Sequence, residues 1–363
     1  MVTAPRSLLL PALLIGAGCA TFEPDVALQD RPLQDPIDAN TFVLSSAKQT
    51  VVGEPQVVFT RAEDTLSDIA RTYGLGYDEI VAANPSVDPW LPGENTAVLL
   101  PTQYVLPDAP QRGVILNIAT KRLFYFPVPV AGELQQVLTF PIGIGRVGWE
   151  TPLGDTTVVS KATDPNWWVP ASVRREHAEM GNPLPKIVPP GPDNPLGAYV
   201  LKLEMPGYLI HGTNQPYGVG MRVSHGCVRL YPENIETLYS LVDIGESVPI
   251  LNEPYQMGRQ DGALYFEAHE PLEDDVMSAE ERLVALLDRQ VDVTGQPLNE
   301  HLRGHVVSLA QSPSGVPVSV VMYDADEVHS RVRVVHNIVE PDPNEPTLSE
   351  VREMMNSLDD ETL

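Results

Sequence analysis

The 363-residue sequence predicts a mainly β central domain of sandwich or barrel type with one prominent helix, next to a small β-α-α-β module and a C-terminal α+β domain. Three observations support this fold class. Between residues 112 and 251, short alternating apolar runs are broken by Gly and Pro, which is typical of an all-β domain. Residues 57–101 hold two short helical patterns between extended runs. Residues 252–363 combine helix-capping patterns with two further extended runs.

The first 18 residues are predicted to be a signal peptide. Arg6 precedes an apolar run over residues 8–15, which is too short to span a bilayer, and Gly16-Ala17-Gly18 follows. Small residues directly before a cysteine resemble the processing box of bacterial lipoproteins, in which Cys19 becomes the lipidated first residue of the mature chain. Ordinary signal cleavage nearby is the alternative. We therefore expect a periplasmic protein that reaches the outer membrane only through a lipid anchor on Cys19.

Residues 19–56 are predicted to be a tether. They are rich in Asp, Pro and Gln, a composition that favours little structure. We expect this segment to connect the anchored end of the chain flexibly to the module that follows.

Residues 57–101 are predicted to form the β-α-α-β module. Asp64 suits the N-cap of a first helix, whose apolar face is formed by Ile69, Ala70 and Tyr73. A second helix is expected from Tyr77 to Ala83. The module resembles LysM, a small unit that binds glycans containing N-acetylglucosamine. The matching residues are Asp64-Thr65-Leu66, Ile69-Ala70, Tyr73, Asn84-Pro85, Gly93 and Pro101. A small helical linker domain is the alternative.

Residues 112–251 are predicted to form the mainly β domain. The expected strands are Gly113–Ile118, Leu123–Phe126, Val137–Ile142, Thr156–Ser160, Tyr199–Leu203 and Tyr208–His211. One helix should begin at Pro232, because proline suits the first helical position, and Gly245 should follow its end. The apolar stripe expected on this helix comprises Ile235, Leu238 and Leu241.

A proline-rich segment between Asp164 and Pro195 interrupts this domain. A connection of that length is usually functional or disordered. Trp167 and Trp168 lie near its start, and this favours a lid over a functional site. The alternative is a surface excursion whose tryptophans only anchor it to the core.

The candidate catalytic residues lie in two segments, His211-Gly212-Thr213 and Ser224-His225-Gly226-Cys227-Val228-Arg229. A cysteine is a useful nucleophile only as thiolate, so it needs a base, and His211 can serve as one. The small residues before Cys227 suit a tight turn whose backbone N–H groups form an oxyanion hole. The alternative is that Cys227 is a small buried apolar residue.

These segments resemble the catalytic domain of the L,D-transpeptidases of YkuD type, in the periplasmic branch that often carries a LysM module. The match runs through Gly143-Ile144-Gly145, Trp149-Glu150-Thr151-Pro152-Leu153-Gly154, Trp168-Val169-Pro170-Ala171-Ser172, His211-Gly212-Thr213-Asn214 and Ser224-His225-Gly226-Cys227-Val228-Arg229-Leu230. The resemblance implies an enzyme that acts on peptidoglycan stem peptides in cell wall biogenesis.

The resemblance also implies a role for each site residue. Cys227 is the nucleophile, His211 its base, and the Gly212 carbonyl holds the imidazole. Ser224, His225 and Gly226 shape the oxyanion site. Substrate binding falls to Arg229, Asn214, Tyr217 and Trp168. The same family likeness implies that carbapenem β-lactams acylate Cys227.

The implied reaction begins on a stem tetrapeptide, from which D-alanine is released as a thioester forms. A diaminopimelate amine would resolve this thioester to a 3→3 cross-link, and a lipoprotein lysine would resolve it by tethering the outer membrane to the wall. With water as acceptor, the enzyme would be an L,D-carboxypeptidase. No cofactor is implied, and no metal, because the His, Cys and Asp residues lack zinc spacing.

Residues 252–363 are predicted to be an acidic accessory domain. They contain 23 Asp and Glu against 7 Arg and no Lys, within a net charge of −26 for the chain. Such a surface disfavours nucleic acid and anionic lipid as partners. Ser278-Ala279-Glu280-Glu281 and Thr347-Leu348-Ser349-Glu350 are capping-box patterns, and residues 317–323 and 331–335 suggest strands. The domain could bind a partner or brace the catalytic domain.

Two other classes of function remain open on the sequence alone. A hydrolase that cuts stem peptides, or releases lipoprotein from the wall, would use the same cysteine and histidine. A non-catalytic wall-binding protein would need only the LysM-like module. That module is expected to fold separately from the catalytic domain and to be dispensable for turnover of a small soluble substrate.

Overall fold

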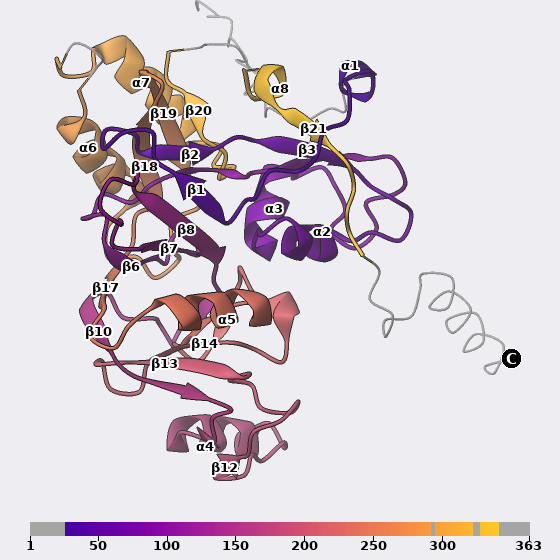
Figure 1. The fold of residues 1–363 in the computed structure, drawn as a ribbon, viewed down its shortest axis with the longest axis vertical. Coiled ribbons are helices and arrows are strands. Elements are labelled where there is room, and N and C mark those ends of the chain that lie inside the picture. The colour runs from indigo at the N-terminus through magenta and orange to yellow at the C-terminus, as the bar shows by residue number, and fades with distance from the viewer. Residues whose placement is uncertain (1–25, 292–294, 322–326, 341–363) are drawn as a thin grey trace, which may run out of the picture.

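The computed structural model describes residues 26–291, 295–321 and 327–340 (Figure 1). The signal peptide, Cys19 and the second capping-box pattern at 347–350 lie outside these ranges. The helices are α1 (Val26–Gln29), α2 (Leu66–Thr72), α3 (Tyr77–Ala83), α4 (Ala171–Glu179), α5 (Pro232–Leu241), α6 (Ala279–Arg289), α7 (Glu300–Leu309) and α8 (Glu327–Arg331), with a 3-10 turn η1 (Pro216–Gly218). The strands are β1 (Thr41–Val43), β2 (Val51–Gly53), β3 (Gln56–Phe59), β4 (Ala97–Leu100), β5 (Gln103–Val105), β6 (Gly113–Asn117), β7 (Arg122–Phe126), β8 (Gln136–Pro141), β9 (Ile144–Gly145), β10 (Gly154–Thr163), β11 (Trp167–Trp168), β12 (Ile187–Val188), β13 (Tyr199–Leu203), β14 (Leu209–His211), β15 (Arg222–Ser224), β16 (Val228–Arg229), β17 (Ser247–Leu251), β18 (Tyr255–Gln260), β19 (Ala263–Ala268), β20 (Val318–Ser319) and β21 (Arg333–Val335).

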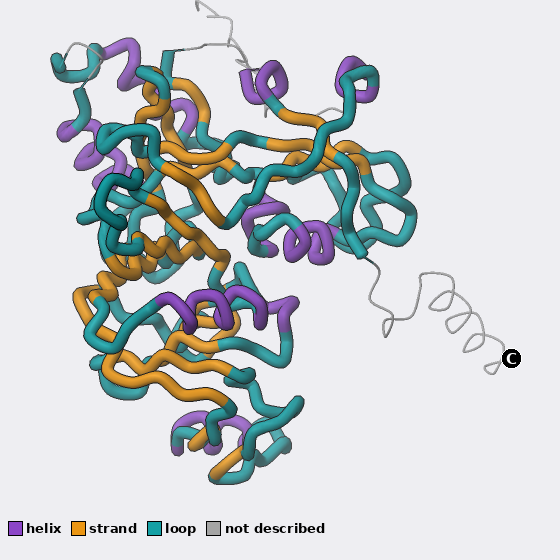
Figure 2. Tube along the Cα trace, in the orientation of Figure 1, coloured by secondary structure: helices purple, strands orange, loops and turns teal. Residues whose placement is uncertain are grey.

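A curled nine-stranded sheet is the largest sheet in the described part of the chain (Figure 2). Its strand order is β1-β8-β7-β6-β17-β10-β13-β14-β16. Strand β10 pairs with β17 over residues 154–157 and with β13 over residues 158–163, and its register shifts between Val158 and Ser160. A register irregularity of this kind bends a strand, so the two halves of the sheet enclose one core. The predicted mainly β character is confirmed.

The sheet packs against a different core on each face, because side chains alternate along a strand. Leu116 of β6 lies in the first core together with Ile210 and Val228, which come from the two strands nearest the far edge of the sheet. Ile115 and Phe124 point the other way, into a second core. β6 and β7 are therefore buried on both faces and consist of buried residues throughout.

Helix α5 covers the first core and begins at Pro232, as predicted. Ile235 and Leu238 are buried in that core, whereas Leu241 is exposed. The apolar stripe of this helix is therefore shorter than the sequence suggests.

The second core joins the β-α-α-β module to the sheet. Strands β3 and β4 pair antiparallel, and the two helices between them lie where the sequence predicts helices. Leu66, Ile69 and Ile80 of these helices are buried in the same cluster as Ile115 and Phe124 of the sheet. Burial of one such side chain contributes about 1.5–3 kcal/mol. The module and the sheet are thus expected to fold together, against the separate folding that the sequence suggested.

A buried ion pair crosses the boundary between the module and the sheet. Arg122 of β7 donates to both carboxylate oxygens of Glu79 on α3, at 2.7 and 2.8 Å, and the two side chains are 1% and 7% exposed. The Arg122 guanidinium also donates to the Gly74 carbonyl at 3.1 Å and lies 4.0 Å from the centre of the Tyr104 ring. Loss of one partner from such a pair typically costs about 3–5 kcal/mol.

The prediction that residues 19–56 form a tether with little structure is wrong for the C-terminal part of this segment. β1 pairs with β8 at the edge of the large sheet, and β2 pairs with β5. Leu44 and Val52 are buried in the second core. The polar composition of residues 19–56 concealed these short strands, because β2 buries only Val51 and Val52 and β1 buries no side chain.

The C-terminal unit is built from β18, β19 and β20 with helices α6 and α7. Ser278 and Glu281 form the predicted capping box at the start of α6, with the Ser278 hydroxyl accepting from the Glu281 amide at 3.2 Å. Leu283, Leu286 and Leu287 are buried, as the helical pattern indicates. Of the predicted strand at 317–323, Val318–Ser319 form β20, and residues 322 and 323 lie outside the described ranges.

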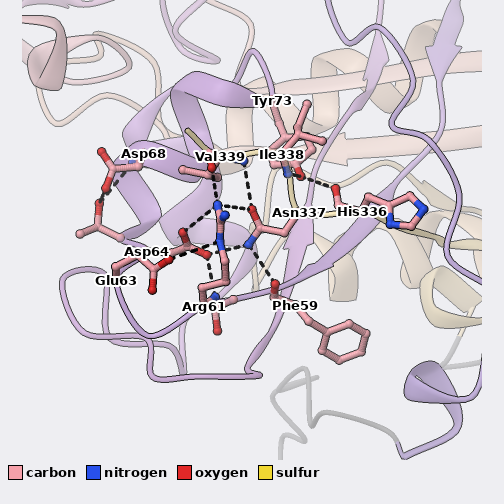
Figure 3. Close-up of polar contacts among 12 residues, drawn as sticks. Phe59, Arg61, Glu63, Asp64, Asp68, Tyr73, His336, Asn337, Ile338 and Val339 are labelled. Carbon is pink, nitrogen blue, oxygen red and sulfur yellow. Dashed lines mark hydrogen bonds and ion pairs between the residues drawn. The ribbon is translucent and has the colours of Figure 1, made fainter. Parts of the chain in front are cut away.

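After α8, the chain returns to the module. β21 pairs in parallel with β3, so the segment beyond the C-terminal unit adds a strand to the module's sheet. Figure 3 shows the polar contacts that follow. Asn337 donates to Asp64 at 2.6 Å and to the Phe59 carbonyl at 3.0 Å, and Tyr73 donates to the His336 carbonyl at 2.7 Å. Residues 333–339 therefore pack mainly with the module, and Val334 also shares a small core with Val316 of the predicted accessory domain.

These contacts also explain one correction inside the module. The N-cap of α2 is Thr65, whose hydroxyl accepts from the Asp68 amide at 3.2 Å, and not Asp64. Asp64 is buried and accepts from the Arg61 amide at 2.7 Å as well as from Asn337. Its carboxylate thus holds the loop and the C-terminal segment together instead of capping the helix.

Candidate active site

Two neighbouring strands place Cys227 and His211 on one face of the sheet. β14 and β16 run parallel, with Ile210 opposite Val228 and His211 opposite Arg229. Ile210 and Val228 point into the first core. Since side chains alternate, His211 and Arg229 point to the opposite face, and so does Cys227, one residue before Val228. Strand pairing thus puts the predicted histidine at the end of β14 beside β16, which the predicted cysteine directly precedes, although 16 positions separate the two residues in the sequence.

The turn before Cys227 is held by hydrogen bonds that the sequence only partly suggested. The Ser224 hydroxyl donates to the Cys227 carbonyl at 2.6 Å and accepts from the Gly226 amide at 3.1 Å. Gly226 has φ +101°, and a Cβ there would lie 2.9 Å from the Tyr208 ring. This position therefore requires glycine. Thr151, which sequence reasoning did not assign to the site, donates to the Gly226 carbonyl at 2.9 Å.

His211 is oriented as a proton acceptor. It is buried, and its Nδ1 lies 2.6 Å from the Gly212 carbonyl. Because a carbonyl only accepts, Nδ1 carries the proton and Nε2 carries the lone pair of the neutral ring. The Leu196 backbone also hydrogen-bonds the ring. Burial, and then the positive charge of Arg229, lower the pKa of His211 to about 3. The imidazole is therefore neutral at physiological pH.

The thiol of Cys227 is likewise neutral in the resting structure. It is free of any disulfide, and its Sγ lies 3.7 Å from the Gly207 carbonyl. Burial raises the pKa of the thiol, while the Leu209 backbone and the Arg229 charge act in the opposite direction. A neutral thiol beside a neutral imidazole can react only when the proton moves as the nucleophile attacks.

Arg229 provides positive charge beside the cysteine. Burial lowers the pKa of its guanidinium, and its Nε is buried with no acceptor among the residues that the structure describes. A partly buried arginine whose Nε lacks an acceptor in the described part of the chain is suited to an anionic ligand such as a carboxylate.

His225 faces the proline-rich insert, which is structured. Residues 164–195 contain the antiparallel pair β11 and β12 with helix α4 between them, at the end of the molecule farthest from the module in Figure 1. His225 Nε2 lies 2.7 Å from Glu176 Oε2 on α4, and the Trp149 ring contacts the His225 ring edge-on at 4.8 Å between centroids. Glu176 also pairs with Arg146.

The remaining predicted residues lie in the insert and in the segment that follows β14. Asn214 donates to the Pro192 carbonyl of the insert at 3.1 Å, and Tyr217 lies half exposed in η1. Trp168 of β11 is 71% exposed. Gly212 packs against α5, where an added Cβ would lie 3.0 Å from Ile235 Cγ2. Strand pairing does not align Asn214, Tyr217 or Trp168 with Cys227.

The described ranges contain no group of three His, Cys, Asp or Glu side chains placed to hold a metal ion. In those same ranges, no helix has both the length and the apolar character needed to cross a bilayer.

Comparison with known proteins agrees with this geometry. Residues 111–250 match the YkuD family, described as the L,D-transpeptidase catalytic domain. The chain is 40% identical to the probable L,D-transpeptidase YcfS of Escherichia coli (strain K12), over 66% of this chain and 76% of that protein. It is 39% identical to the probable L,D-transpeptidase YbiS of the same strain, over 71% and 85%. It is 36% identical to the probable L,D-transpeptidase ErfK/SrfK of Salmonella typhimurium (strain LT2), over 78% and 91%.

Proposed function

Because this chain belongs to the L,D-transpeptidase family and acts on peptidoglycan, we propose that it works through a cysteine acyl-enzyme formed on Cys227. One observation carries this proposal. The parallel pairing of β14 and β16 sets His211 opposite Arg229, two residues after Cys227, and the contact of Nδ1 with the Gly212 carbonyl leaves the lone pair of the neutral ring on Nε2.

The first half-reaction forms the thioester. His211 Nε2 takes the thiol proton as Sγ attacks the carbonyl that joins residues three and four of the stem tetrapeptide. The C–N bond then breaks, and His211 returns the proton to the leaving amine of D-alanine. In the second half-reaction an acceptor amine attacks the thioester, an amide forms, and the thiol is regenerated with the proton relayed by His211.

Two groups next to Cys227 would stabilise this chemistry. The Gly226 N–H already donates to Ser224, whereas the Cys227 N–H has no acceptor among the described residues. We therefore assign the Cys227 N–H as an oxyanion donor, with Ser224, His225 and Gly226 shaping the turn. Arg229, whose buried Nε lacks an acceptor in the described chain, would bind the substrate carboxylate.

The module would hold the enzyme on its polymeric substrate. Trp90, in the loop between α3 and β4, is 58% exposed, and its ring centre lies 6.1 Å from that of Tyr77. Exposed aromatic rings provide apolar faces on which sugars can pack. Glycan strands of peptidoglycan are accordingly the proposed partner of this LysM-like module.

The C-terminal unit would brace the catalytic domain. Asp274 accepts from Arg222 of β15 at 2.9 Å, and Leu272 packs against the first core. β15 leads directly into the turn that carries Cys227. This bracing role fits the contacts.

The acceptor and the location follow from the same proposal. The acceptor would be a diaminopimelate amine or a lipoprotein lysine, and the protein would act in the periplasm, anchored to the outer membrane through a lipidated Cys19. Asn214, Tyr217 and Trp168 would contact the stem peptides at the edge of the site.

Incubation with purified disaccharide-tetrapeptides, with and without an amine acceptor, tests the reaction by mass spectrometry. The proposal expects D-alanine release and an amide product that appears only with the amine, and neither from Cys227→Ala. Release of D-alanine without any amide product would instead identify an L,D-carboxypeptidase. No turnover by the folded wild-type protein, together with binding to cell walls, would favour a non-catalytic wall-binding protein.

A further inference from the structure

An ionic cluster links the insert to the turn that carries Cys227. Glu176, on α4 of the insert, accepts from His225 with its Oε2 at 2.7 Å and pairs through its Oε1 with Arg146. Arg146 in turn donates its backbone N–H to the Ser224 carbonyl at 3.1 Å. Glu176 therefore joins three segments that lie apart in the sequence. They are the insert itself, the turn that contains His225, and the loop of Arg146, which contacts the backbone of that turn.

The geometry determines what each group does. The 2.7 Å separation from a carboxylate places the proton of His225 on Nε2. The Arg146 guanidinium also lies close to this nitrogen, at 3.2 Å, and both groups are donors. The Glu176 carboxylate holds the two together, since it is the acceptor for both. The cluster is only a quarter to two-fifths exposed, so it is screened less than a surface pair.

We propose that Glu176 is a positioning residue, which fixes His225 and thereby seats the insert, residues 164–195, against the turn of the nucleophile. The proposal rests on the function proposed for Cys227, because it concerns the placement of that residue. A second contact supports it. The Pro192 carbonyl of the insert accepts from Asn214, close to His211 along the chain. The insert is thus tied to both segments that carry the cysteine and its base.

The charges of this cluster predict how the pKa of His225 responds to substitutions, which a contact without charges would not. The charged and titratable groups that face His225 are Glu176 and His177 from α4 and Arg146 from the loop after β9. Glu176 favours the imidazolium, whereas Arg146 disfavours it. Replacing Glu176 by Gln should therefore lower the pKa of His225, and replacing Arg146 by Gln should raise it.

The test compares Glu176→Gln, Glu176→Ala and Arg146→Gln with Glu179→Gln, an exposed carboxylate at the end of the same helix. Two readouts are required: kcat and KM for a soluble tetrapeptide with an amine acceptor, and the NMR titration of the His225 ring. We expect kcat/KM to fall on the order of tenfold or more in Glu176→Ala, because small misplacements of reacting groups are costly. Glu176→Gln, which keeps an acceptor for His225, should lose less, and Glu179→Gln should match the wild type.

The positioning role also requires opposite shifts of the His225 titration in Glu176→Gln and Arg146→Gln. Wild-type kinetics in Glu176→Ala, or a His225 titration that does not respond to either change, would overturn it. Failure of the underlying function is a separate result, since it would appear as no turnover in the wild type or as undiminished turnover in Cys227→Ala.

Discussion

At the scale of single residues, the catalytic pair is kept neutral by burial. His211 has its pKa lowered to about 3, and the thiol of Cys227 has its pKa raised. Both shifts are dominated by desolvation, which disfavours whichever form is charged. The resting site therefore holds a neutral thiol and a neutral imidazole, and not a thiolate–imidazolium pair. A protonated thiol is a weaker nucleophile than a thiolate.

Alkylation measures this state directly. For the wild-type protein with iodoacetamide, we expect a slow reaction at neutral pH and a rate that keeps rising above pH 9, since the thiol pKa lies above its usual value. Arg229→Gln removes a charge that favours the thiolate, so its rate at a fixed pH should be lower. A rate that reaches its plateau by pH 7 would show a preformed ion pair instead.

Thr151 offers a second test at this scale. Its hydroxyl accepts from the Gly145 amide at 3.0 Å and donates to the Gly226 carbonyl at 2.9 Å. Thr151→Val keeps the shape but leaves both backbone groups unpaired, which should cost about 1–3 kcal/mol of stability and lower kcat. Thr151→Ser retains the hydroxyl and should stay near the wild type in both thermal unfolding and turnover. Equal behaviour of the two variants would show that the hydroxyl has no such role.

At the scale of elements, what could be predicted was local and what was missed came from distant segments. Neighbouring residues alone determine three features that the structure contains. These are the Ser224–Cys227 turn, the start of α5 at Pro232 and the capping box of α6. Glu176 and Arg146 could not be assigned, because only the folded insert brings them to His225. The same holds for β21, whose partner β3 precedes it by more than 270 residues.

The ion pair between α3 and β7 gives a prediction for these elements. Glu79→Gln leaves the Arg122 guanidinium buried without a carboxylate, so the free energy of unfolding should fall by about 3–5 kcal/mol. Denaturant unfolding measures this change, and Asp78→Asn, on the same helix and paired with Lys121 near the surface, is the control that should cost less than about 1 kcal/mol. Similar losses in both variants would contradict the importance of the buried pair.

At the scale of the whole molecule, the module, the large sheet and the segments on either side of them share cores and sheets and are not separate domains joined by linkers. The module shares a core with the large sheet, β1 and β2 belong to the fold, and residues 333–339 cross back onto the module. Composition suggested separate domains because it reports the character of a segment and not the surface against which that segment packs. A glycan-binding surface fixed to the catalytic sheet would present the polymer to the site in one orientation.

This arrangement changes what removal of the module should do. Deletion of residues 57–101 would expose Ile115 and Phe124, so we expect an aggregated or poorly folded protein rather than a soluble active one. Trp90→Ala, on an exposed ring, should instead weaken co-sedimentation with insoluble peptidoglycan while turnover of a soluble tetrapeptide stays unchanged. A soluble deletion protein with full turnover would show that the module is an independent domain.

The central claim is that Cys227 carries the acyl group, and intact-protein mass spectrometry tests it most directly. A carbapenem forms the thioester by opening its own ring, so nothing leaves and the adduct has the mass of one inhibitor molecule. We expect one such adduct on the wild-type protein and none on Cys227→Ala, with both proteins folded by circular dichroism. An unmodified wild-type mass after long incubation, or an adduct of equal yield on Cys227→Ala, would contradict the assignment of Cys227 as the nucleophile.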